Sequence, residues 1–169
     1  NLDVSAVINM SRMFSNCNSN VNVEGWNTSK VTNISYMFNY FEGSIDLSKL
    51  DFSSVTNANY MFNYAKINGI NLIGLSFPKA TSFNNLFSYA EGDSLDLSSW
   101  DISNITAMPY MFNHAKVKKI DLTNWKTTNV TDMGNMFYYC TGLTSLDLSS
   151  FDTSNVTIMN GMFYSCRNL

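Results

Sequence analysis

The sequence predicts an α/β solenoid, in which a short structural unit is repeated and stacked along one axis. A Met-Phe or Leu-Phe pair recurs every 24 to 26 residues and divides the 169 residues into seven units with incomplete ends. In six units an aliphatic residue stands 15 positions before the phenylalanine, whereas the segment after the phenylalanine varies in length. This pattern indicates a rigid unit joined to the next by a surface loop. One such unit cannot bury its own apolar face, so the units must stack.

The constant segment begins with a short strand. Aliphatic residues alternate there with polar ones, as in Leu146, Asp147 and Leu148, and a period of two residues is typical of a strand with one face in the core. We expect one such strand in each unit, parallel to its neighbours and about 4.8 Å from them. A large apolar residue three positions further on, such as Trp100, continues the core. The expected strands end at Val23, Leu47, Leu72, Leu97, Leu122 and Leu148.

A polar turn and a short helix complete the unit. After the turn, the apolar spacing changes to the three and four residues that place side chains on one face of a helix. In six units a threonine stands before this stripe, and we interpret it as a helix N-cap or part of a hydroxyl ladder rather than a ligand contact. The predicted stripe is clearest in the last two units, with Met133, Met136, Phe137 and Cys140 in one and Met159, Met162, Phe163 and Cys166 in the other.

The strand segment also carries a recognisable motif. Residues 143–148 read Leu-Thr-Ser-Leu-Asp-Leu, the LxxLxL strand signature of leucine-rich repeats. The longer segment 140–159 is more specific, and with it nearly the whole chain resembles the BspA-like leucine-rich repeat surface proteins of bacteria. Residues 75–80 depart most from the pattern. The resemblance implies a leucine-rich-repeat-like solenoid on the outside of the cell, with an adhesion or recognition role and no enzymatic activity.

The composition indicates one globular domain that spans residues 1–169. The chain is 45% hydrophobic, and no run of 18 apolar residues predicts a membrane-spanning helix. Ten Lys and Arg residues against thirteen Asp and Glu residues argue against a nucleic-acid partner. The first unit lacks its strand, and no capping segment is visible at either end, so we expect a fragment of a longer surface protein.

No pattern in the sequence indicates catalysis. The one histidine, His114, occupies a slot that carries tyrosine in other units, and no serine or cysteine nucleophile stands at a fixed distance from it. Cys17, Cys140 and Cys166 share an apolar slot with alanine and phenylalanine, so we interpret them as core thiols, although a disulfide between Cys140 and Cys166 is geometrically possible. We therefore predict a protein with no catalytic residues, no metal site and no cofactor.

The strand face is the first candidate binding surface. Stacking turns each outward position of the strand into a row with one side chain per unit. Carboxylates, amides and hydroxyls in such rows suit a glycan, or a host or matrix protein with basic residues. A merely solvated face is the alternative, and calcium fits less well because it needs oxygens that converge on one point. The predicted binding residues of this face are Asp46, Asn71, Asp96, Asp121, Asp147, Ser98, Thr123 and Ser149.

Exposed tyrosines form the second candidate surface. Tyr36, Tyr60 and Tyr110 point away from the predicted apolar stripe, and an exposed tyrosine offers contact area together with a hydroxyl group. A further tyrosine row, in which His114 stands, flanks the stripe, and we interpret it as packing between units. The predicted function is a recognition module on the cell surface, and the alternative is a structural stalk that displays another domain. The sequence leaves the oligomeric state open.

Overall fold

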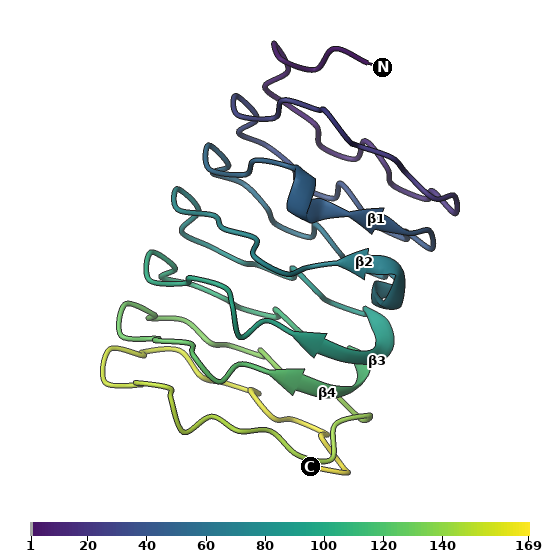
Figure 1. Cartoon of the computed structure of the whole chain (residues 1–169). Helices are drawn as coiled ribbons and strands as arrows, with labels where there is room; N and C mark the ends of the chain where they lie inside the picture. The colour runs from purple at the N-terminus through teal and green to yellow at the C-terminus, as the bar shows by residue number, and fades with distance from the viewer. Residues whose placement is uncertain (1) are drawn as a thin grey trace.

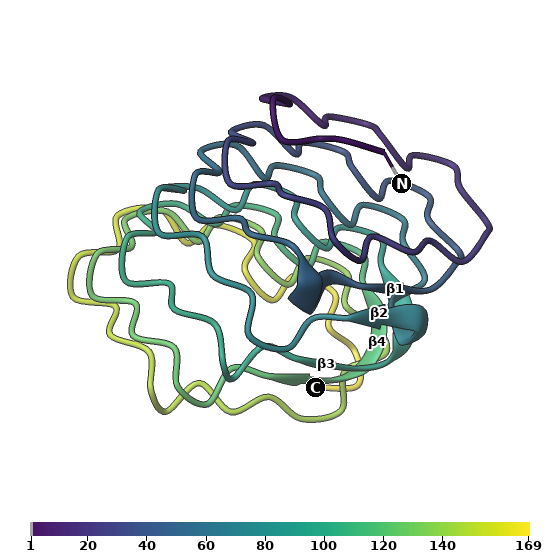
Figure 2. The same ribbon diagram turned by 45° about the horizontal axis from the view of Figure 1, so that its top comes forward.

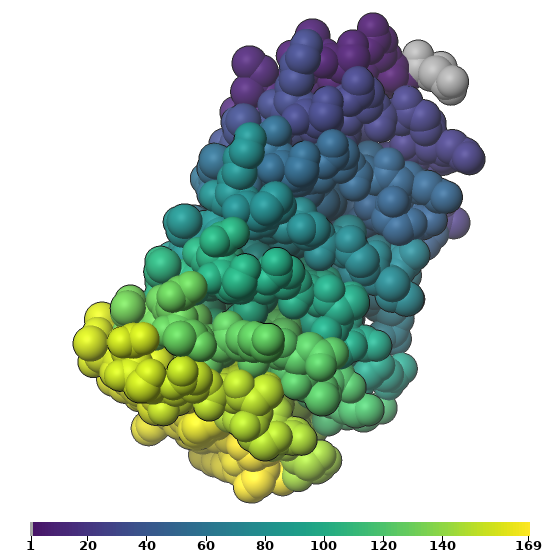
Figure 3. Space-filling model, turned by 60° about the vertical axis from the view of Figure 1, so that its left-hand side comes forward, coloured from purple at the N-terminus to yellow at the C-terminus, as the bar shows by residue number. Residues whose placement is uncertain are grey.

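The chain winds into a stack of coils, with one repeat unit in each coil. The computed structural model describes residues 2–169, and the first and last coils lie at opposite ends of the stack (Figure 1). The coils follow the same course one behind another in the turned view, and they succeed each other in chain order in the space-filling view (Figures 2 and 3). Parallel bridges join equivalent positions of adjacent coils, for example Asn9 to Asn33 and Ala107 to Asp132.

Regular secondary structure is confined to one side of the stack. Strands β1 (Ile45–Asp46) and β2 (Ile70–Asn71) form one parallel pair, and β3 (Glu91–Asp96) and β4 (Lys116–Asp121) form another. Two short 3-10 helices, η1 (Leu47–Lys49) and η2 (Ile67–Gly69), flank the first pair. These four strands lie side by side in successive coils (Figure 1).

The predicted α/β solenoid with a helix in every repeat is wrong. Residues 2–169 contain no α-helix, and strands form in only four of the six predicted places. Near Val21 there is only an isolated bridge to Ile45, and residues 146–148 form no strand. Most of each coil consists of turns.

Backbone geometry explains why the predicted helices do not form. Two residues per coil, four positions apart, have positive φ, such as Tyr36 at 56° and Tyr40 at 54°, and an α-helix cannot contain such residues. The amide of Met37 donates to the carbonyl of Ile34, which closes a turn within the coil, at 3.1 Å. The amide of Phe38 instead donates to the carbonyl of Met61 in the next coil, at 2.8 Å. Alternate amides thus close turns and join coils, so the backbone is satisfied without a helix.

The apolar stripe is nevertheless buried in the interior of the stack. Met133, Met136, Phe137 and Cys140 have no exposed surface. The phenylalanine rings of successive coils stack into a column, with centroids 5.3 Å apart between Phe112 and Phe137. In the last coil this burial is incomplete: Met159 and Phe163 are each 42% exposed.

The repeated threonines form a hydroxyl ladder. The hydroxyl of Thr131 donates to the carbonyl of Thr106, and that of Thr157 to the carbonyl of Thr131, each at 3.2 Å. Thr56 and Thr106 make the same contact with the coil before them. With no α-helix present in residues 2–169, the N-cap interpretation does not apply.

Candidate functional site

The residues predicted for the middle of the strand face form a row along the strand side of the stack, here called the acidic row: Asp46, Asn71, Asp96, Asp121 and Asp147. Asp96 and Asp121 are opposite each other in the register of β3 and β4, and Asp147 holds the same position in the next coil. Asp46 and Asn71 are opposite each other in β1 and β2. The structure therefore brings the predicted residues of the row together in two groups.

Each aspartate of the row closes a tight turn with the residue two positions after it. Oδ1 of Asp96 accepts a hydrogen bond from the amide of Ser98 at 3.0 Å and from its hydroxyl at 2.6 Å. Asp121 accepts the same two bonds from Thr123, and Asp147 accepts one from the amide of Ser149 at 2.9 Å. These are Asx turns, in which a side-chain oxygen replaces a backbone carbonyl. Ser98, Thr123 and Ser149 thus hold their neighbouring aspartates in place, a role that sequence reasoning missed.

The second oxygen of these carboxylates stays available. Within residues 2–169, Oδ2 of Asp96, Asp121 and Asp147 makes no hydrogen bond. The side-chain hydrogen bond from Thr123 holds the pKa of Asp121 below its usual value, and the backbone hydrogen bond from Ser149 does the same for Asp147. Asp147 in turn acts to raise the pKa of Asp121, because the two negative charges repel each other. The turns thus orient the three carboxylates, and their hydrogen bonds favour the ionised form of Asp121 and Asp147.

The other end of the row is less acidic. The side-chain amide of Asn71 donates to Oδ1 of Asp46 at 2.9 Å, so one charge is shared across two coils. A shallow depression of about 440 Å³ lies beside this pair. Gly69 lines it, and a Cβ there would lie 2.4 Å from the carbonyl oxygen of Gly43, so the close approach of the two coils requires glycine.

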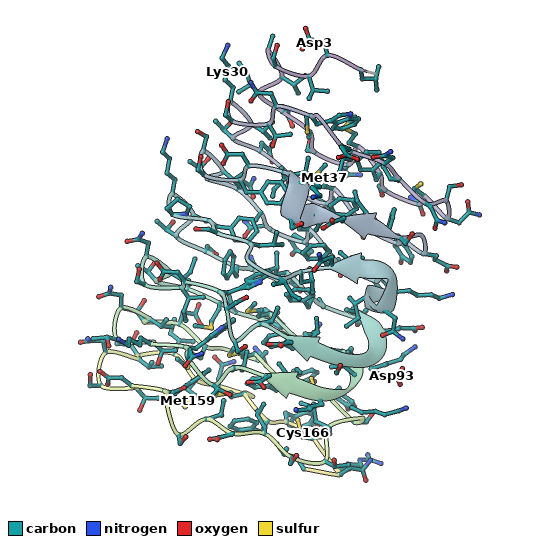
Figure 4. The ribbon with its side chains drawn as sticks, viewed as in Figure 1. Asp3, Lys30, Met37, Asp93, Met159 and Cys166 are labelled. Atoms are coloured by element: carbon teal, nitrogen blue, oxygen red, sulfur yellow. The ribbon has the colours of Figure 1, made fainter. Side chains whose placement is uncertain are left out.

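Two of the three lysines of β4 have ion-pair partners, whereas Lys119 forms no ion pair within residues 2–169 and its charge acts to lower the pKa of Asp121. Lys118 pairs with Asp93 at 2.9 Å and Lys116 pairs with Glu91 at 2.7 Å, in both cases from β4 to β3. Asp93 lies at the edge of the strand side (Figure 4). Both pairs are exposed, so they contribute little to stability. The two pairs neutralise the charges of Glu91 and Asp93, which lie outside the row. The carboxylates of Asp96, Asp121 and Asp147 have no ion-pair partner in residues 2–169.

The predicted tyrosine set is only partly brought together. Tyr36 and Tyr60 stack with ring centroids 4.6 Å apart, and the guanidinium of Arg12 lies 4.8 Å from the centre of the Tyr36 ring. Asn85 occupies the equivalent slot of the next coil, so Tyr110 stands apart from this pair, with 41% of its surface exposed.

The flanking row forms the longer aromatic surface. Its rings stack through five coils at centroid distances between 4.3 and 4.8 Å, and the outermost ring, Tyr40, is 46% exposed. Packing between units is thus observed, but the ring edges also reach the surface. Burial lowers the pKa of His114, which favours the neutral imidazole in this row. The stacked rings are Tyr40, Tyr64, Tyr89, His114 and Tyr139.

Of the three predicted core thiols, Cys140 is buried, whereas Cys17 and Cys166 are partly exposed and pack against the core. The Cys140 thiol donates to the carbonyl of Phe112 at 2.9 Å, and burial raises its pKa to about 12. Cys166 makes the same contact with Phe137, and all three cysteines are free. Residues 2–169 hold no group of three or more His, Cys, Asp or Glu side chains that could bind a metal ion. In the same range, no helix is long and apolar enough to cross a membrane.

Comparison with known proteins assigns the chain to a family. The family model described as "Mycoplasma protein of unknown function, DUF285" matches residues 1–95 and again residues 81–169. No curated protein and no solved structure matches the chain. Because the two matches together span the whole chain, it belongs to the DUF285 family.

Proposed function

We propose that the chain is a non-enzymatic recognition module of the cell surface, which binds a host or matrix protein or a glycan through its acidic row. One observation carries this proposal: the carboxylates of Asp96, Asp121 and Asp147 are held by Asx turns in three successive coils, and each has an oxygen free for a partner. Basic side chains and sugar hydroxyls are the groups that such oxygens bind.

The geometry of the row favours binding in two ways. Strands in adjacent coils are about 4.8 Å apart, so the free oxygens are regularly spaced along the stack. The turns fix the side chains before a partner arrives, so binding does not have to order them. A partner with several cationic or hydroxyl groups would therefore engage more than one coil at once.

An extracellular location is part of this proposal. It is supported by the resemblance of residues 140–159 to the repeats of the BspA-like surface proteins. A surface location gives a polar, repetitive face access to large partners, which is what an adhesion role requires.

A structural stalk is the second candidate. One observation favours it: within residues 2–169, every buried side-chain nitrogen or oxygen has a hydrogen-bond partner, so these polar groups serve the stability of the stack. A stalk would need no property of the acidic row beyond the turns themselves.

Neutralising the row without breaking its turns distinguishes the two roles. Asparagine closes the same turn in this chain, since Oδ1 of Asn22 accepts from the amide of Glu24 at 2.9 Å. We therefore propose the triple variant Asp96→Asn, Asp121→Asn, Asp147→Asn, tested on arrays of matrix proteins and glycans. The matched control is Asp51→Asn, Asp101→Asn, Asp152→Asn, which removes three charges from the same kind of turn at another corner of the coils.

Loss of binding in the first variant and not in the control would support recognition by the acidic row. Equal binding by both variants and the unmodified chain would refute this site. Absence of binding to every component of the arrays would favour the stalk.

A further inference from the structure

Eight of the nine tyrosines gather on one side of the five inner coils, which extend from the coil of Phe38 to that of Phe137. In each of these coils, the two residues before and the two residues after the buried Met-Phe or Leu-Phe pair point away from the core, as residues 35–36 and 39–40 do. These positions comprise twenty residues, here called the tyrosine face. None of the twenty is a Lys, Arg, Asp or Glu residue.

The backbone of this face does not require tyrosine. In each coil, two of the four positions have positive φ, for example Tyr64 at 57° and Tyr89 at 58°. Asparagine adopts this conformation more readily than tyrosine, and it does so at Asn85 and Asn135, where the neighbouring coil carries Tyr110. The turns could therefore form with asparagine throughout, and what tyrosine adds is its ring and its hydroxyl group.

The rings in the middle of the flanking row present their edges rather than their faces. Tyr64 lies between Tyr40 and Tyr89, with ring centroids 4.4 and 4.3 Å away and interplanar angles of 7°. His114 is stacked in the same way between Tyr89 and Tyr139. A nucleic-acid base stacks on the face of an aromatic ring, and the faces of these inner rings are already covered. Ring edges and phenol hydroxyls therefore remain for contact with a partner.

The rest of the face consists of neutral hydrogen-bonding groups. The side-chain amide of Asn63 donates to Oδ1 of Asn39 at 2.8 Å, and that of Asn113 donates to the hydroxyl of Ser88 at 3.0 Å. The whole chain has a net charge of −3, and carboxylates line its strand side. Two copies that met through their strand sides would therefore repel each other, whereas two tyrosine faces bring no like charges together.

We propose that the tyrosine face binds the tyrosine face of a second copy, which produces a two-fold symmetric dimer. A phenol hydroxyl both donates and accepts a hydrogen bond, so the face is complementary to itself. The flanking row also has two rings on either side of Tyr89. An antiparallel second copy therefore places Tyr89 opposite Tyr89 and Tyr64 opposite His114. This dimer goes beyond the proposed function, because no residue of the acidic row takes part in it.

The size and rigidity of the face suit such a contact. All but three of its twenty residues are exposed or half-buried, and a standard interface has about 20–30 residues on each side. Tyrosine, serine and asparagine also dominate the binding loops of antibodies, because tyrosine offers contact area at a low cost in conformational entropy. Stacking within the flanking row holds the rings before a partner arrives, which lowers this cost further.

The test adds a charge to the face or removes one hydroxyl group from it. Tyr89→Lys places two like charges opposite each other at the two-fold axis. Tyr110→Lys adds a charge at a ring that is 41% exposed and stands outside the flanking row, so the stacking is kept. Tyr64→Phe keeps the ring and removes its hydroxyl. Ile73→Lys is the matched control, because Ile73 is 68% exposed and lies outside the face, after β2.

Sedimentation equilibrium measures the mass of each variant over a range of protein and salt concentrations, and far-UV circular dichroism verifies that each variant is folded. The unmodified chain and Ile73→Lys should rise from 19.1 kDa to twice this mass and no further, because a two-fold contact closes on itself. Tyr89→Lys and Tyr110→Lys should remain at 19.1 kDa. Tyr64→Phe should raise the dissociation constant about tenfold, because symmetry removes two hydrogen bonds. Higher salt should not weaken the dimer.

A monomeric unmodified chain would overturn the proposal, and so would a mass that grows beyond twice 19.1 kDa. Dimers of Tyr89→Lys and Tyr110→Lys as stable as those of the unmodified chain would show that the contact lies elsewhere. If the unmodified chain is monomeric and its binding to an array of matrix proteins is lost in Tyr110→Lys, the face serves a different protein and the second copy is the wrong partner.

Discussion

Truncation of a ring in the middle of the phenylalanine column tests how the stack is held together. Phe112 is fully buried, and its ring lies 5.8 Å from that of Phe87 and 5.3 Å from that of Phe137. These neighbours are fixed by the backbone bonds of their own coils, so they cannot collapse into the space that Phe112→Ala leaves. We expect the free energy of unfolding to fall by about 3–5 kcal/mol.

The end of the same column provides the control. The ring of Phe163 packs on Phe137 at 5.6 Å, but 42% of this residue is already exposed. Phe163→Ala should therefore cost less, about 1–2 kcal/mol.

Urea unfolding followed by tryptophan fluorescence and circular dichroism measures both effects. Trp26 lies on the N-terminal side of the truncated ring and Trp125 on the C-terminal side. Because each coil contacts only its neighbours, Phe112→Ala should also broaden or split the transition, since the two halves of the stack become less strongly coupled. If Phe112→Ala and Phe163→Ala cost the same and the slope is unchanged, the reasoning from the column is refuted.

Four further predictions concern the turns, the charges and the chemistry. Gly69→Ala should lower the midpoint of urea unfolding, because a Cβ there would lie 2.4 Å from the carbonyl oxygen of Gly43, whereas Gly74→Ala meets no atom and should show only the strain of its positive φ. The folded chain lowers the pKa of four aspartates below the ordinary value of 3.8, namely those of Asp46, Asp101, Asp121 and Asp152. Their ionised forms therefore stabilise the folded state at a pH above 3.8, and this stabilisation is lost as the pH falls through the lowered pKa values. Urea midpoints between pH 7 and pH 2 should show this loss, and the loss should be smaller in the triple asparagine variants. Asp96→Lys, Asp121→Lys should weaken binding of a partner whose affinity for the unmodified chain falls with salt, and should also lower the midpoint of urea unfolding because lysine cannot accept the amide hydrogen bonds of the two turns. Binding through Tyr36, Tyr60 and Tyr110 would be almost indifferent to salt. The purified chain should hydrolyse no ester, peptide, glycoside or nucleotide, and an activity abolished by His114→Ala would contradict this.

Sequence periodicity was sufficient to identify the repeat and its buried slots, but not the local backbone. A side chain is buried when it points into the core. The spacing of Met133, Met136 and Phe137 places these side chains on one face whether the backbone is a helix or a series of turns. The difference lies in the sign of φ at positions such as Asn135 and Tyr139. Asparagine tolerates positive φ, so Asn135 carried a signal, whereas tyrosine adopts it less readily and concealed the turn. The helical spacing therefore predicted correctly which side chains are buried, but it predicted the wrong backbone hydrogen bonds.

The candidate site shows a similar division. Spacing alone aligned the acidic row with the strands, because adjacent coils place equivalent residues next to each other. The partner of each Asp Oδ1 was two positions away along the chain, in an Asp-x-Ser or Asp-x-Thr pattern that is a known signal for a turn. The tyrosine column required coordinates, because stacking depends on the backbone twist that holds Tyr64 between Tyr40 and Tyr89.

The charge of the acidic row exceeds what its turns need. An Asx turn requires one side-chain oxygen that accepts a backbone amide, and neutral asparagine supplies it at Asn22 and Asn71, with bonds of 2.9 and 3.1 Å. In the following three coils the same turn is closed by Asp96, Asp121 and Asp147. The charge of Asp147 acts to raise the pKa of Asp121 across the gap between coils, whereas the charge of Lys119 acts to lower it. Three ionised groups at this spacing repel each other, and the repulsion contributes nothing to the turn. A partner that supplies positive charge or hydroxyl donors to the free oxygens would offset this repulsion, and this is the physical reason to prefer recognition over a stalk.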